Sequence, residues 1–75
     1  MSLTHRQREI VTLLCEGLTT KQIARRLGVV PPVVSNHLLA VRKANGLKNI
    51  AQIGIAAERA GIARLPGDEH RTTGS

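Results

Sequence analysis

Apolar residues recur along this chain at intervals of three and four positions, the spacing typical of helices with one buried face. Four stretches show it, with apolar stripes at Ile10, Val11, Leu14 and Leu18; at Ile23, Ala24 and Leu27; at Val34, Leu38 and Val41; and at Ile53, Ala56, Ala57 and Ala60. No pair of alternating apolar and polar stretches flanks a turn, as a β-hairpin would require. The pattern predicts an all-α domain of four helices.

Helix start signals stand ahead of all four stretches. Thr4 with Gln7, and Thr19 with Gln22, have the spacing of capping boxes, in which each side chain bonds to the backbone N–H of the other residue. Proline is well tolerated in a first helical turn, so the third helix is expected to begin near Pro31. The segment from residue 49 to 52 opens the fourth. Glycines mark the expected ends: Gly17, Gly28, Gly46 and Gly61.

The second and third predicted helices have the spacing of a helix-turn-helix. A helix of two turns is followed by a turn at residues 28–30, with Val29 expected to point inward, and then by a longer helix. Such a pair crosses at a wide angle, which leaves one side of the third helix uncovered and able to enter a DNA major groove about 12 Å wide. The sequence therefore predicts a four-helix bundle with a central helix-turn-helix.

Length and composition allow one small domain, expected in residues 1–63. Beyond Ala63 no apolar period continues, so residues 64–75 are expected to form a disordered tail. The single cysteine cannot form an internal disulfide, and no apolar run approaches the roughly 18 residues of a membrane span. The N-terminus lacks the layout of a signal peptide. We expect a reduced, cytoplasmic domain with no membrane contact.

The positive charge is confined to the middle of the chain. Eleven Lys and Arg residues against five Asp and Glu residues give a net charge of +6. No acidic residue stands between Gly17 and Ala57, a window that holds Lys21, Arg25, Arg26, Arg42, Lys43 and Lys48. Segregated charge of this kind is typical of a surface that binds nucleic acid, although small basic proteins also separate charge by chance. The absence of Phe, Tyr and Trp argues against modules that stack bases on aromatic rings.

No catalytic or metal-binding arrangement is evident in the sequence. It contains no Ser-His-Asp set, no paired carboxylates and no glycine-rich phosphate loop, so an enzyme is not expected. His37 lies beside the third apolar stripe and has no second ligand at helical spacing, so packing is the expected role of its imidazole. We expect no metal site and no cofactor.

The chain resembles the LuxR/GerE type of DNA-binding domain over residues 3 to about 62. The residues that carry the resemblance are Leu3-Thr4-x-Arg6-Gln7-Arg8-Glu9-Ile10, then Leu13-Leu14-x-Glu16-Gly17-Leu18-Thr19-Thr20-Lys21-Gln22-Ile23-Ala24-Arg25-Arg26-Leu27-Gly28-Val29, then Val34-x-x-His37-Leu38, Val41 and Gly46-Leu47-Lys48-Asn49. The resemblance implies a bacterial transcription regulator that binds double-stranded DNA with its third helix in the major groove. It is either the output domain of a longer, response-regulator-like chain or a stand-alone regulator, with RNA polymerase or an upstream regulatory domain as possible partners.

Base contacts are expected from Ser35, Asn36 and Leu39, the positions that match the base-contacting residues of the family. The amide of Asn36 can pair with both N6 and N7 of adenine, which makes it the best candidate for direct readout. Leu39 can touch a thymine methyl, or it can belong to a protein-contact surface. The family often has basic residues where Ser35 and Leu39 stand, so this chain departs from the family pattern at two of its three candidate base-contact positions.

Contacts to the DNA backbone are expected at two places. Residues at the start of the second helix combine free N–H groups with a favourable helix dipole: Thr19, Thr20, Lys21 and Gln22. Helix capping is a compatible alternative role for them. Basic residues at and beyond the end of the third helix are expected to flank the groove: Arg42, Lys43 and Lys48. Arg42 and Lys43 can alternatively serve to complement the helix dipole.

The fourth helix has small side chains, and its isoleucines point in more than one direction. The resemblance implies a homodimer contact here, for which the candidates are Ile50, Ile53, Gly54 and Ala57. The alternative is that some of the isoleucines close the core of the monomer.

Two other functions remain open from the sequence. A protein-interaction domain that kept the fold and lost base reading is suggested by apolar Val30, Val33 and Leu39 on or near the exposed helix. A domain like region four of sigma factors shares the opening Leu-Thr-x-Arg and the basic second helix, but it resembles the chain less after Gly17.

Overall fold

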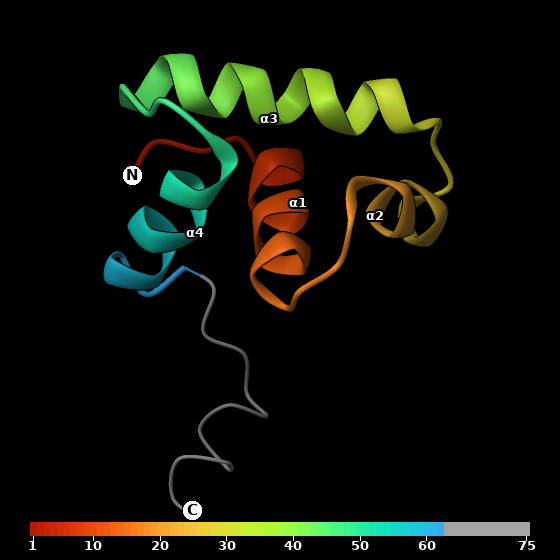
Figure 1. Cartoon of the computed structure of the whole chain (residues 1–75), viewed down its shortest axis with the longest axis horizontal. Coiled ribbons are helices and arrows are strands. Elements are labelled where there is room, and N and C mark those ends of the chain that lie inside the picture. Colours follow the sequence, from red (N-terminus) through yellow and green to blue (C-terminus); the bar gives the residue numbers. More distant parts are fainter. Residues whose placement is uncertain (63–75) are drawn as a thin grey trace, which may run out of the picture.

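The computed structural model describes residues 1–62, which contain four helices (Figure 1). They are α1 (His5–Cys15), α2 (Thr20–Leu27), α3 (Pro31–Asn45) and α4 (Ile50–Arg59). No strand occurs among these residues, and the predicted all-α, four-helix architecture is confirmed. The expected boundary at residue 63 and the tail at residues 64–75 lie outside the described residues.

Both predicted capping boxes form. The backbone N–H of Gln7 donates to Thr4 Oγ1 at 3.1 Å, and the N–H of Thr4 donates to Gln7 Oε1 at 3.0 Å. At α2 the N–H of Gln22 donates to Thr19 Oγ1 at 3.2 Å, and the N–H of Thr19 donates to Gln22 Oε1 at 2.8 Å. These bonds satisfy backbone groups that a helix start would otherwise leave to solvent.

Helix α3 starts and ends where its sequence predicts. It has no side-chain cap, and two prolines set its first turn instead. Gly28, which ends α2, has φ +72°, and the next N–H, that of Val29, donates to the Ala24 carbonyl at 2.9 Å. Only glycine adopts this left-handed conformation at little cost, so Gly28 turns the chain sharply into α3. Val29 packs against the core, as expected.

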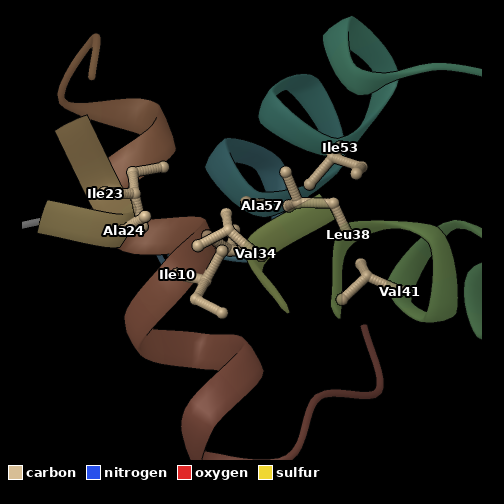
Figure 2. Packing of buried hydrophobic residues seen from close by; sticks show 9 residues of the cluster. Ile10, Ile23, Ala24, Val34, Leu38, Val41, Ile53 and Ala57 are labelled. Atoms are coloured by element: carbon tan, nitrogen blue, oxygen red, sulfur yellow. The ribbon is translucent and has the colours of Figure 1, made fainter. Parts of the chain in front are cut away.

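The core is built from small aliphatic layers that all four helices supply (Figure 2). Its buried members are Ile10, Val11, Ile23, Ala24, Val34, Leu38, Val41, Ile53 and Ala57. Half-buried leucines of α1 and α2 surround them. The predicted stripe of α3 is confirmed, because all three of its residues are at most 2% exposed.

Helix α3 lies across the other three helices along one edge of the molecule (Figure 1). It contacts α1, α2 and α4, and all three lie on the same side of it. Its opposite side is therefore free of protein contacts within residues 1–62. The fold thus presents one side of its longest helix to the outside.

Candidate nucleic-acid interface

One row of side chains runs along the outward side of α3. Pro32, Asn36, Leu39 and Lys43 follow one another at intervals of four, three and four residues, which aligns them along a helix. All four are exposed, whereas Leu38, next to Leu39 in the chain, is 2% exposed. We call these four residues the outer row.

The three residues predicted to contact bases are all exposed on α3. Asn36 and Leu39 belong to the outer row, separated by one helical turn. Ser35 lies about 100° around the helix from Asn36, toward the flank, because successive helical residues turn by that angle. The structure therefore brings Asn36 and Leu39 together at the most protruding part of the helix and places Ser35 beside them.

At the start of α2, two of the four predicted phosphate contacts already have partners. Thr19 Oγ1 and Gln22 Oε1 accept the bonds of the capping box. Of the first backbone N–H groups of this helix, those of Thr20 and Lys21 have no acceptor within the described part of the chain. Because the positive end of the helix dipole lies here, these two N–H groups and the exposed Lys21 side chain are the groups suited to an anion.

The side chain of Arg42 is directed toward the backbone of the turn that follows α3. Its Nη2 donates to the carbonyl of Lys48, and its Nε is buried without a hydrogen-bond partner among residues 1–62. The N–H of Leu47 also donates to the Arg42 carbonyl, at 2.8 Å. Arg42 therefore fixes the turn between α3 and α4, whereas Lys43 and Lys48 are exposed at that end of the helix.

The basic residues between Gly17 and Ala57 form no ion pairs among residues 1–62. Both ion pairs found among the described residues lie on α1, where Glu9 Oε1 is 3.8 Å from His5 Nε2 and 3.7 Å from Arg6 Nη1. Exposed pairs of this kind contribute little to stability. Between Gly17 and Ala57, five exposed basic side chains have no acidic partner among residues 1–62: Lys21, Arg25, Arg26, Lys43 and Lys48.

The predicted dimer contacts on α4 need a correction. Ile53 and Ala57 are 0% exposed and belong to the core, so the prediction that they contact a second chain is wrong. The helix needs an inward side to pack on α1 and α3, and these two residues supply it. Ile50 and Gly54 remain accessible, and Ile55, which the prediction left out, is 52% exposed.

Other chemistry is sparse in the described region. Within residues 1–62 no three His, Cys, Asp or Glu side chains gather closely enough to hold a metal ion. No helix there has the length and apolarity to cross a bilayer. Partial burial of the Cys15 thiol, together with the nearby Glu58 carboxylate, raises the pKa of that thiol above its ordinary value. The thiol is therefore kept in its protonated, weakly nucleophilic form.

Asn45 has a structural role that the sequence did not reveal. Its side chain accepts from the N–H of Ser2 at 2.8 Å and donates to the carbonyls of Ser2 and Val41 at 3.0 and 2.9 Å. The first residues of the chain are thereby attached to the last turn of α3. These bonds join residues 43 positions apart, and an isolated Asn before a glycine gives no signal of such a partner.

The sequence is similar to those of known proteins. The profile of the family described as "Bacterial regulatory proteins, luxR family" matches residues 1–57. The putative HTH-type transcriptional regulator Rv0890c of Mycobacterium tuberculosis is 43% identical over 60 residues, which are 80% of this chain and 7% of that protein. The chain therefore spans less than a tenth of that relative.

Two further relatives are similar over most of this chain. The DNA-binding transcriptional activator DevR/DosR of Mycobacterium tuberculosis is 35% identical over 66 residues, 88% of this chain and 30% of that protein. The spore germination protein GerE of Bacillus subtilis is 36% identical over 63 residues, 84% of this chain and 85% of that protein. The chain thus matches a small part of some relatives and nearly the whole of another.

Proposed function

This chain belongs to the luxR family of bacterial regulatory proteins, and from that premise we propose that it binds double-stranded DNA sequence-specifically as part of a transcription regulator. In this proposal α3 enters the major groove. The observation that carries it is the outward side of α3, which bears the outer row and is covered by none of the other three helices (Figure 1). A major groove about 12 Å wide admits a helix presented in this way.

We assign the phosphate contacts to the two ends of the helix-turn-helix. At α2 the groups are the N–H groups of Thr20 and Lys21 with the Lys21 ammonium, and beyond α3 they are Lys43 and Lys48. Thr19 and Gln22 act mainly as the cap that holds these N–H groups in place. Arg42 acts mainly through the α3–α4 turn. The uncompensated charge of this region supports binding to a polyanion.

Duplex affinity is expected to fall with rising salt. A plot of the logarithm of the binding constant against the logarithm of salt concentration should have a slope of about −0.9 for each phosphate neutralised. Replacing Lys21 by alanine should reduce the steepness of the slope by about that amount, since one cation leaves the interface. Fluorescence anisotropy of a labelled duplex, titrated at several salt concentrations, measures this directly.

Arg59→Ala is the matched control for Lys21→Ala. It removes one exposed positive charge from the end of α4, which points away from α3 in Figure 1, so the slope should stay unchanged. Weak binding that does not depend on salt would contradict the proposed function. It would favour a protein-interaction domain, for which the exposed Val30 and Val33 at the start of α3 are the supporting observation.

We also propose that two copies of the chain associate through the outer side of α4 and bind two DNA half-sites. Ile55 lies on the side of this helix opposite the buried Ile53 and Ala57, and Ile50 and Gly54 are also accessible, about 140° and 100° around the helix from it. A shallow groove beside Ile55, lined also by Met1 and Leu47, adds apolar surface. Exposed aliphatic side chains gathered on one helix favour a protein contact.

Ile55→Glu is expected to weaken dimerisation at least tenfold, because a charge at the centre of an interface costs on the order of 2 kcal/mol or more. Sedimentation of the purified chain, free and on duplex DNA, gives the dissociation constant. Val30→Glu is the control for the free chain, since it places the same charge on exposed apolar surface outside α4. A wild-type chain that sediments only as monomer, with and without DNA, would refute the dimer.

The same proposal covers the location and the further partners of the domain. The described residues act as one DNA-binding domain whose function is binding rather than catalysis, in the cytoplasm where the chromosome lies. RNA polymerase or a regulatory domain of the same protein is the expected further partner. The family match also favours this type over a sigma-factor domain.

A further inference from the structure

The outer row of α3 alternates in chemistry along its length. Asn36 and Leu39 form its middle, Pro32 lies toward the start of the helix and Lys43 toward the end. From Pro32 to Lys43 the row extends about 16 Å at 1.5 Å per residue, which exceeds the groove width of about 12 Å. In a helix seated across the groove, the end members therefore lie near the phosphates and the two middle members reach the base edges.

The two middle residues lie close together on one side of α3. Asn36 and Leu39 are about 4.5 Å apart along the helix axis, at about 1.5 Å per residue. They also lie within about 60° of each other around the helix. The two side chains therefore face the same base pair or neighbouring base pairs.

We propose that this pair reads adenine and thymine in neighbouring base pairs, an inference that rests on the proposed function. The Asn36 amide accepts from N6 and donates to N7 of an adenine, and the Leu39 side chain packs on the C5 methyl of a thymine. The half-site that the chain prefers therefore contains adjoining A·T pairs at its centre.

The exposure of Leu39 supports a contact made only in the complex. It is 42% exposed in the folded chain, and the other three helices lie on the opposite side of α3. In the complex, a thymine methyl gives the Leu39 side chain an apolar partner that it does not have in the free protein. The middle of the row also has no Lys or Arg, the side chains that most often bond to guanine.

The test begins with selection of duplexes from a random-sequence library by the whole chain. Adjoining A·T pairs should be enriched at the centre of the selected half-site. Single thymines of the selected duplex are then replaced by deoxyuridine, which lacks only the C5 methyl. One replacement should weaken wild-type binding about fourfold, because burying a single methyl or methylene group contributes about 0.8 kcal/mol to the free energy of binding.

Leu39→Ala should bind thymine and uracil duplexes equally, because the group that senses the methyl is gone. Val33→Ala is the control, since it trims a comparably exposed aliphatic residue of the same helix to which no base contact is assigned, and it should keep the wild-type ratio between the two duplexes. That ratio is independent of any general change in affinity. Because Leu39 is exposed, its truncation should leave the fold intact, and helix content by circular dichroism checks this.

The outcomes separate this inference from the proposed function. Salt-dependent duplex binding with a G·C consensus, or with no sensitivity to uracil at any thymine, overturns the reading of A·T pairs and leaves DNA binding standing. Equal uracil sensitivity in the wild type and in Leu39→Ala also overturns it, because another residue then contacts the methyl. Failure to bind any duplex overturns the proposed function itself.

Discussion

Replacing Leu38 by alanine is expected to leave much of the chain unfolded at 25 °C. Leu38 is 2% exposed and packs at the centre of α3 against the other buried residues (Figure 2). Truncating a buried leucine to alanine costs about 2 to 5 kcal/mol, which includes the cavity left behind. A single core in a domain of this size rarely supplies more than about 3 to 5 kcal/mol, so the loss is comparable to the whole stability.

Leu39→Ala is the matched control, because it makes the same change at the adjacent residue. Leu39 is 42% exposed, and its truncation should change the free energy of unfolding by less than about 1 kcal/mol. Urea denaturation followed by far-ultraviolet circular dichroism measures both variants. Intrinsic fluorescence is unsuited to the purpose, since the chain contains no tryptophan or tyrosine. Equal destabilisation by the two substitutions would contradict the assignment of inward and outward sides to α3.

Helix boundaries in this chain were predictable because they depend on neighbours in the sequence. The bonds between Thr4 and Gln7, and between Thr19 and Gln22, join residues three positions apart. The glycine at residue 28 ends its helix through a conformation that glycine favours for its own steric reasons. Local rules of this kind do not depend on tertiary contacts, so they can be applied to the sequence alone. Together with the period of the apolar stripes they predict the four helices.

The fourth helix was only partly predictable, because its composition does not distinguish its two sides. Isoleucines at residues 50, 53 and 55 point in different directions around the helix. Which of them faces inward depends on how α4 packs against α1 and α3. The structure places Ile53 in the core and leaves Ile55 outside, so the stripe assigned to a dimer belongs in part to the monomer.

The candidate DNA interface was also only partly predictable from the sequence. The exposure of Asn36 followed from the apolar stripe on the other side of α3, so its position was accessible from periodicity. The role of Arg42 was not, because its guanidinium bonds to a carbonyl in the following turn. A basic residue at the end of a helix predicts charge near the groove, but the tertiary structure decides whether that charge is directed outward or toward the backbone of the following turn.

The largest effect on sequence preference is expected from Asn36→Ala. The amide of Asn36 pairs with two groups of adenine in the proposed complex, and a bidentate pair discriminates against a wrong base by about 1 to 3 kcal/mol. Affinity for the preferred duplex should therefore fall about 5- to 150-fold, whereas affinity for random duplexes should change little. The salt slope should remain that of the wild type, since no charge is removed.

The helix itself should tolerate this substitution, because Asn36 is exposed and alanine has the higher helix propensity. Ser35→Ala is the control on the neighbouring exposed position, and its effect should be smaller because a hydroxyl can bond to either type of base. A duplex with 7-deazaadenine at the contacted position, which lacks N7, should weaken wild-type binding and leave Asn36→Ala unaffected. If Asn36→Ala instead weakens binding to all sequences equally, Asn36 contacts the DNA backbone, and the sequence preference must come from other residues of α3.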